Sequence, residues 1–171
     1  MFWFKIIKKV VKILHSNATP AQIALAIAFG LLAGFSPALS PQAFFFLLLI
    51  FIINMNLGMA FISMGLFKLL VLLFDAPSHY LGTMFLVDMS FLKGFWTMLY
   101  NMPIIPFTKF NNTVVLGNLI IAVAGFIPVY FLSKKGVVFY REKLQEKVEK
   151  FKIMKIFKAS KFYNWYQKLL A

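Results

Sequence analysis

The chain has 171 residues, of which 61% are hydrophobic and 18% aromatic, and its formal net charge at pH 7 is +13. A water-soluble fold of this composition would have too little polar surface to cover it, so the composition excludes an ordinary soluble domain. The chain has no cysteine, which excludes a disulfide framework, a thiolate metal site and a cysteine nucleophile.

Positive charge is concentrated at the two ends of the chain. Of the eighteen Lys and Arg residues, four lie in positions 1–12 and eleven in positions 134–171, so positions 13–133 hold only Lys68, Lys93 and Lys109. A bilayer core and an anionic cytoplasmic leaflet select this pattern. We therefore predict a multi-pass membrane protein with both termini in the cytoplasm. Anionic phospholipid headgroups are the expected partners of the charge, and nucleic acid is not.

Residues 1–16 mix basic and apolar side chains. The basic ones interrupt the continuous apolar run that a signal peptide needs. Helical spacing predicts an interfacial amphipathic helix, with Trp3 at headgroup depth and lysines that reach the lipid phosphates. The alternative is a basic topology signal alone. The lipid-facing lysines of this segment are Lys5, Lys8, Lys9 and Lys12.

Residues 17–133 are the predicted membrane domain, which contains five apolar segments. Thr19 is expected to cap the first helix and Pro20 to occupy its first position. The segments are residues 20–35, 42–53, 57–74, 81–105 and 113–132.

The lengths of these segments limit how they can be arranged. A transmembrane helix needs about twenty apolar residues, so segments 57–74 and 113–132 qualify, whereas 20–35 and 42–53 are short. The short pair is either two thin spans or a re-entrant hairpin, and a hairpin needs its broken backbone buried in protein or facing a wet cavity. Cytoplasmic termini require an even number of crossings, so we place residues 75–112 outside, at the interface. The predicted fold class is all-α, with four crossings or with two crossings and a Pro-broken helical hairpin.

Residues 134–171, which begin with Lys134 and Lys135, are expected to form a basic cytoplasmic or surface-lying helix. Glu146 and Lys150 make a favourable i,i+4 pair. Aromatic and leucine side chains at 163–170 suit the membrane interface or a groove in a partner.

A face of small residues marks the first apolar segment. Small side chains at steps of four let helix backbones approach closely in a membrane. This face predicts packing against the second or third segment, or close approach of a substrate to the backbone. Its residues are Gln22, Ala26, Gly30 and Gly34.

The Ser-Pro-rich break after this segment is a candidate binding site. Half-helix ends at membrane depth hold ions or anionic groups in transporters, and a plain external loop is the alternative. Asn54 and Asn56 either hydrogen-bond between helices or turn the chain. The residues of the break are Ser36, Pro37, Ser40, Pro41 and Gln42.

Lys68 lies inside the third segment, where a central lysine costs about 2.5–3.5 kcal/mol on insertion scales. Such a charge is a candidate functional group. The structural alternative is that its side chain reaches toward Asp75, two turns away on the same face.

The acidic residues give little support to catalysis. Three of the five acids lie in the basic tail, and the remaining two, Asp75 and Asp88, have no histidine-rich or metal-ligand cluster near them in sequence. We expect no enzymatic activity, no metal and no cofactor.

Prolines and small residues carry a family resemblance over roughly residues 17–130. The positions are Thr19-Pro20, Ala24, Ala26, Gly30, Gly34, Pro37, Pro41-Gln42, Asn56 and 77–82. This pattern resembles the bacterial membrane family known as domain of unknown function 2062, and the run Phe-Asn-Asn-Thr-Val-Val at 110–115 resembles one branch of it. Many members have Asn-Pro where this chain has Gly65-Leu66-Phe67-Lys68, so no role of that motif is carried over.

The resemblance implies an inner-membrane protein, in this branch often accompanied by a larger membrane-anchored envelope protein, and no particular chemistry. Two functions remain open. One is a non-enzymatic subunit that anchors or docks a larger envelope protein, with lipid transport as a candidate activity of the complex. The other is a small carrier or channel for an ion or solute.

Overall fold

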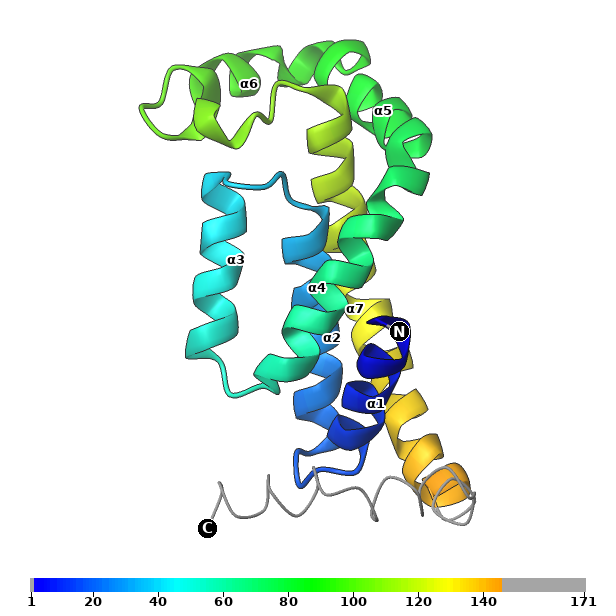
Figure 1. The fold of residues 1–171 in the computed structure, drawn as a ribbon. Coiled ribbons are helices and arrows are strands. Elements are labelled where there is room, and N and C mark those ends of the chain that lie inside the picture. Colours follow the sequence, from blue (N-terminus) through cyan, green and yellow to red (C-terminus); the bar gives the residue numbers. More distant parts are fainter. Residues whose placement is uncertain (1, 146–171) are drawn as a thin grey trace.

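The computed structural model describes residues 2–145, which form helices and turns without a strand (Figure 1). This confirms the predicted all-α fold class. The α-helices are, in chain order, α1 (Phe2–Leu14), α2 (Pro20–Phe35), α3 (Pro41–Ile52), α4 (Leu57–Leu70), α5 (Asp75–Thr83), α6 (Lys93–Tyr100) and α7 (Thr113–Phe139). Shorter 3₁₀ turns lie at Val71–Phe74, Ser90–Leu92 and Ile105–Thr108, and π-helical turns at Met84–Asp88 and Tyr140–Leu144.

Two helical stretches, Leu57–Asp88 and Thr113–Leu144, are long and apolar enough to cross a membrane. Each has 32 residues, or about 48 Å at 1.5 Å per residue, against a hydrocarbon core of about 30 Å. The first stretch joins α4, the 3₁₀ turn and α5. Residues 75–83, which we expected outside the membrane, therefore continue the long helix, and they pack along α7.

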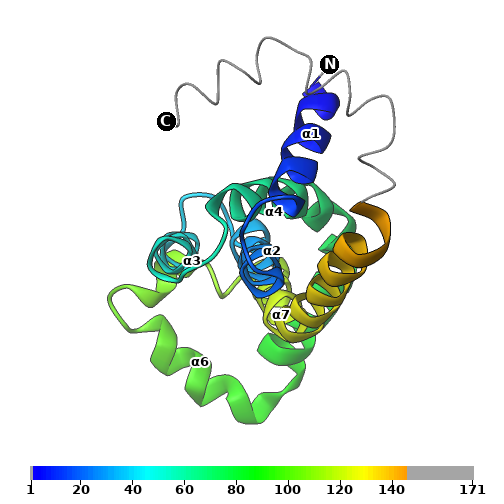
Figure 2. The same cartoon turned by 90° about the horizontal axis from the view of Figure 1, so that it is seen from below.

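Helix α2 lies in the middle of the molecule, with α3, α4 and α7 around it (Figure 2). Every residue from 28 to 36 is buried. A helix that is apolar on all sides is expected to be buried on all sides. Thr19 caps it in a reciprocal capping box with Gln22, and Pro20 occupies its first turn, as predicted.

The α2–α3 hairpin is shorter than the two long helices. In Figure 1, α2 and α4 run in one direction, and α3 and α7 run in the other. With 16 and 12 residues, α2 and α3 are about 24 Å and 18 Å long, less than the hydrocarbon core. The ring of Phe35, at the end of α2, lies 6.3 Å from that of Phe67 and 5.4 Å from that of Phe74. The long helix thus continues to Asp88, well beyond the tip of the hairpin.

Residues 89–112, which we call the shelf, connect the two long helices and include α6. The shelf lies above the upper end of α3 (Figure 1). Gln42, at the start of α3, donates a hydrogen bond of 2.9 Å from Nε2 to the carbonyl oxygen of Thr108. Trp96 stacks on Phe110 at 5.8 Å and donates from Nε1 to the carbonyl oxygen of Phe85. These contacts hold the shelf to both the hairpin and the long helix.

The C-terminal part of the described chain continues α7. This helix ends only at Phe139, so the boundary that we placed between residues 133 and 134 falls inside it: Lys134 and Lys135 extend the helix rather than ending it. The Glu146–Lys150 pair and the aromatic end at 163–170 lie outside the described residues, as does the side chain of Trp3.

Candidate functional site

The Ser-Pro-rich turn at the tip of the hairpin satisfies its polar groups internally. Ser36, the residue that follows the last residue of α2, donates from Oγ to the carbonyl oxygen of Leu32 at 2.8 Å. Ser40 donates from Oγ to the carbonyl oxygen of Pro37 at 2.8 Å and accepts from the amide of Ala43, which caps α3. Both serines are buried. Both serine hydroxyls are thus bonded to backbone groups of α2, the turn and α3 rather than directed at a ligand.

Leu39, in this turn, has a left-handed backbone with φ of 58° and an 87% exposed side chain. This conformation is unfavourable for a branched residue without a local hydrogen bond from its own side chain. Gln42 donates from Nε2 to the Thr108 carbonyl oxygen of the shelf. Its Oε1 is buried without a hydrogen-bond partner among the described residues.

Lys68 reaches the hairpin tip rather than Asp75. Its Nζ donates a hydrogen bond of 2.5 Å to the carbonyl oxygen of Ser36. That carbonyl lies at the C-terminal end of α2, where cations are favoured by the helix dipole and the unpaired carbonyl groups. Of the two alternatives considered for Lys68, the structural one, a side chain that reaches toward Asp75, is not what the structure shows: the acceptor is the Ser36 carbonyl.

The outward side of α4 and α5 carries these two charges. Lys68 and Asp75 are both exposed and lie two turns apart on the same side of the long helix. Among the described residues, no hydrogen bond or ion pair involves the Asp75 carboxylate. Gly65, one turn before Lys68, is exposed, and a Cβ atom added to it would meet nothing within 4 Å. Phe61 and Leu72 are the exposed apolar residues of this side. We call these five residues the α4–α5 face.

The small residues of α2 form its contact with α4. A Cβ atom on Gly30 would collide with the side chain of Ser63, and one on Gly34 would lie 2.7 Å from Cβ of Phe67. Ser63 donates from Oγ to the carbonyl oxygen of Ala26 at 3.2 Å. The face thus packs within the molecule, against the third predicted segment.

Gln22, at the lower end of this face, joins the turn between α3 and α4. Its side chain donates from Nε2 to Oδ1 of Asn54 at 3.0 Å, and its backbone carbonyl oxygen accepts from the backbone amide of Asn56 at 3.4 Å. Asn56 also caps α4 by accepting from the amide of Met59 at 2.8 Å. The two asparagines therefore serve both of the uses that we considered, contact between helices and turning of the chain.

A second close contact, between α5 and α7, was missed by the sequence analysis. A Cβ atom on Gly82 would collide with the backbone of Thr113, and one on Gly117 with the backbone of Ser78. Ser78 donates from Oγ to Oδ1 of Asn118 at 2.6 Å, and both side chains are buried. The sequence does contain a pattern that predicts this contact. Small residues lie four positions apart on each helix, at 78 and 82 on α5 and at 113 and 117 on α7.

The end of α7 meets the end of α1 at a junction of polar contacts. The lysines of α1 are exposed, as are Lys134 and Lys135. Arg141 donates from Nε to the carbonyl oxygen of Leu14 and from Nη2 to those of Ser16 and Ala18, at 2.8–3.0 Å. His15 and Tyr140 are also hydrogen-bonded, at 3.0 Å. Arg141 therefore fastens the end of α7 to the linker between α1 and α2, a role that the sequence did not predict.

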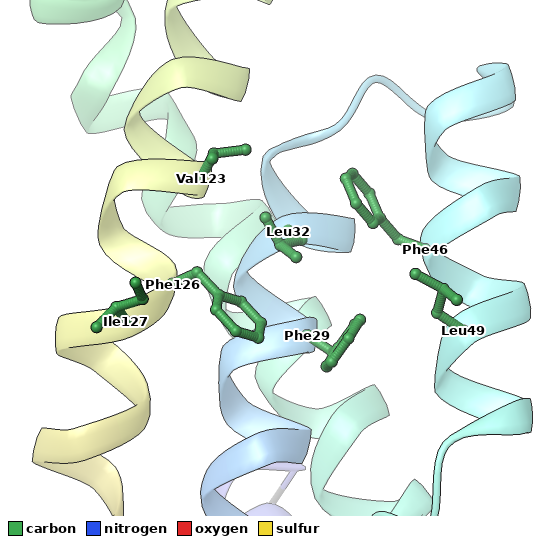
Figure 3. A pocket seen from close by; sticks show the side chains of 7 residues that line it. All are labelled: Phe29, Leu32, Phe46, Leu49, Val123, Phe126 and Ile127. Atoms are coloured by element: carbon green, nitrogen blue, oxygen red, sulfur yellow. The ribbon is translucent and has the colours of Figure 1, made fainter.

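An apolar groove of about 350 Å³ opens between α2, α3 and α7 (Figure 3). Helix α2 forms its floor, and α3 and α7 form its walls. It is lined by Phe29 and Leu32 from α2, Phe46 and Leu49 from α3, and Val123, Phe126 and Ile127 from α7. In the part of the chain that the structure describes, no three His, Asp or Glu side chains gather as a metal site would require.

Comparison with known proteins places the chain in a family. A protein of Treponema pallidum (strain Nichols), named "Uncharacterized protein", is 30% identical over 135 residues, which cover 79% of this chain and 83% of the relative. No solved structure matches the chain. A family match covers residues 5–146, which is most of the chain and confirms the resemblance noted from its small residues and prolines. The chain therefore belongs to the bacterial family described as "Uncharacterized protein conserved in bacteria (DUF2062)".

Proposed function

We propose that the protein is a non-enzymatic inner-membrane subunit that docks a larger membrane-anchored envelope protein, in a complex for which lipid transport is the candidate activity. The observation that carries this proposal is the α4–α5 face, where two charges and an open glycine lie on the outside of a helix that is long enough to cross the membrane. The occupant of the face is a single transmembrane helix of the partner.

The two charges support this choice because lipid is a poor environment for both. A lysine at the centre of a membrane helix costs about 2.5–3.5 kcal/mol. Its ammonium group has three N–H donors, and the bond to the Ser36 carbonyl uses one of them. Two donors remain for a carboxylate on the partner at the same depth, while the carboxylate of Asp75 suits a basic or polar partner residue two turns further along.

Gly65 supports the same choice from packing. The other glycines in contact with a neighbouring helix, such as Gly30 and Gly82, are explained within the molecule. No contact within the molecule explains Gly65, because a Cβ atom added to it would meet nothing within 4 Å. Small residues are enriched where membrane helices approach closely, so the open face at Gly65 fits a helix from another chain.

The proposed topology is two crossings by the long helices with a re-entrant α2–α3 hairpin, both termini in the cytoplasm and the shelf on the opposite side. Arg141 bonds to the end of α1, so the two basic ends lie together, as cytoplasmic termini require. The shelf holds only two charged residues and exposes aromatic side chains such as Phe91 and Tyr100, which suits the membrane interface. The exposed lysines of α1 then face anionic phospholipid headgroups.

A carrier or channel would place the Ser-Pro turn and Lys68 on a wet pathway. Instead, the Ser36 hydroxyl bonds to a carbonyl of α2, the Ser40 hydroxyl bonds to a carbonyl of the turn, and Lys68 lies on the outside of the long helix. These contacts favour docking over transport through the subunit itself.

The test is purification of the tagged full chain from its own membrane in mild detergent, with a photo-crosslinking residue at Gly65. We expect a larger membrane protein at a fixed stoichiometry, and a crosslink from Gly65 to that same protein. A crosslinker at Leu48, which is exposed on the outer side of α3, is the matched control and should not give this product.

Charge variants complete the design. Lys68→Met and Asp75→Asn should each reduce recovery of the partner, whereas Lys135→Met, a matched change at an exposed lysine away from this face, should leave it unchanged. Recovery of the chain alone, or an intact complex with Lys68→Met, would overturn the proposal.

A further inference from the structure

The groove between α3 and α7 lies on a different side of the molecule from the α4–α5 face. Its lining side chains are all apolar, and they come from the upper half of α2 and the middle of α3 and α7. Val123 and Ile127, on the α7 wall, are 56% and 63% exposed, so the groove is open to the surroundings on this side. In a chain that spans a membrane, the medium that meets such an opening is hydrocarbon.

The shelf limits what can occupy this groove. Seen from below, α6 and its flanking turns pass across the open side between α3 and α7 (Figure 2), at the level above the top of α3 (Figure 1). The bond from Gln42 to the Thr108 carbonyl holds the shelf there. A transmembrane helix needs about twenty residues across the whole bilayer, and one that ran along this groove would meet the shelf. A chain that enters from one leaflet and ends near the bilayer centre would not.

The shelf also supplies charge for a headgroup. Residues 89–112 contain Lys93 and Lys109 and no acidic residue. Both lysines are exposed, and neither has an ion-pair partner among the described residues. Lys109 directly follows Thr108, so it lies near the upper end of the α3 wall. Lysines near a membrane surface attract anionic lipid headgroups.

We propose that the groove holds one acyl chain of a phospholipid in the leaflet next to the shelf, with the phosphate of its headgroup at Lys93 and Lys109. The apolar walls accept the chain, the shelf sets its depth, and the lysines select an anionic headgroup. This site is independent of the docking face, and it exists in the isolated chain.

The test uses the purified full chain in vesicles of phosphatidylcholine that contain a trace of phosphatidylglycerol with a photoactivatable diazirine on its acyl chain. Crosslinked positions are mapped after illumination. We expect labelling at Val123 and Ile127 that saturates and exceeds, severalfold, the labelling at Leu48 and Phe51, two exposed residues on the outer side of α3 that report ordinary boundary lipid.

Two kinds of variant separate the chain site from the headgroup site. Val123→Trp should fill the groove and reduce its labelling severalfold, whereas Leu48→Trp, the same change on an exposed control position, should not; thermal melting checks that both variants fold. Replacing Lys93 and Lys109 with Gln should reduce labelling by phosphatidylglycerol about fivefold per lysine, and labelling by the matching phosphatidylcholine probe much less.

Equal labelling at Val123 and Leu48, or labelling that Val123→Trp leaves unchanged, would show boundary lipid only and overturn the proposal. Labelling of the groove in the isolated chain that disappears in a purified complex would assign the groove to a partner protein, and would overturn it as well.

Discussion

The ammonium group of Lys68, on α4, donates a hydrogen bond of 2.5 Å to the backbone carbonyl oxygen of Ser36, at the end of α2. The bond joins the long helix to the tip of the short hairpin, at the point where the chain turns through Pro37. It satisfies a carbonyl that the helix itself leaves unpaired, and it leaves the lysine exposed on the outside of the helix. One residue therefore serves the packing of the hairpin and the charge of the α4–α5 face.

Lys68→Met should separate these two roles. A hydrogen bond to a charged group contributes about 1.5–3 kcal/mol, which is comparable to the cost of about 2.5–3.5 kcal/mol for placing the lysine in the membrane. We therefore expect Lys68→Met to insert normally and to keep its thermal stability in detergent, while it loses partner association and cellular function.

Lys68→Arg is the companion variant, because it keeps both the charge and a donor for the Ser36 carbonyl. It should retain part of the function. Full complementation of a deletion strain by Lys68→Met would show that the charge has no functional role.

Replacing Gly30 and Gly34 with Leu should destabilise the molecule. The added side chains would enter the space held by Ser63 and Phe67, and overpacking typically costs about 1–3 kcal/mol. Thermal melting in detergent measures the effect. Gly136→Leu is the matched control, since a Cβ atom there would meet nothing within 4 Å. Equal melting temperatures for the two variants would contradict the contact between α2 and α4.

The positions where helices begin could be predicted from the sequence, because they depend on residues that are neighbours in the chain. The start of α2 followed from Thr19 and Pro20. The predicted segment 113–132 also begins where α7 does, directly after Asn112, which accepts from the amide of Val115 at 3.1 Å. Capping depends on residues three positions apart, so the printed sequence contains all that is needed to predict it.

Contacts between distant segments were harder to predict. The sequence offered Asp75, two turns away, as one alternative for Lys68, but the Ser36 carbonyl, 32 residues away, is the acceptor. Arg141 bonds to residues more than 120 positions earlier. A backbone carbonyl carries no sequence signal, so neither partner could have been identified without the arrangement of the helices.

The buried pair of Ser78 and Asn118 should contribute to the contact between α5 and α7. Hydrogen bonds between membrane helices contribute about 0.6 kcal/mol on average and up to about 1.7 kcal/mol. We expect Ser78→Ala and Asn118→Ala each to lower stability, with a coupling energy in this range in a double-mutant cycle measured by unfolding in detergent. Additive single effects would mean that the 2.6 Å contact has no energetic role.

Arg141→Lys should weaken the junction between α1 and α7. The planar guanidinium donates to three carbonyl oxygens at once, and a lysine ammonium lacks this fork geometry. We expect a lower melting temperature and faster proteolysis of the linker at 15–19. Lys134→Ala changes an exposed basic residue on the same helix and should have little effect. Identical proteolysis of the two variants would argue against the junction.

Single cysteines in this cysteine-free chain test the proposed topology. Asn111 and Ser90, both exposed on the shelf, should react with a membrane-impermeant maleimide from the outer side only, and Asn17, exposed before α2, from the cytoplasmic side only. Ser78 is unsuitable because it is fully buried.

Leu39→Cys is the decisive position for the hairpin. Its side chain is 87% exposed at the tip, so the protein itself does not shield it from reagent. The tip is bonded to the shelf through Gln42, so in a re-entrant hairpin it lies just inside the hydrocarbon core below the outer interface. Leu39→Cys should then react from the outer side much more slowly than Asn111→Cys, and not at all from the cytoplasmic side, because an impermeant reagent does not enter that layer. After solubilisation in detergent, it should react with a small membrane-permeant maleimide, which shows that the thiol is available. Rapid labelling of Leu39→Cys from the outer side of intact membranes would mean that α2 and α3 each cross the bilayer, and would replace the two-crossing arrangement with four.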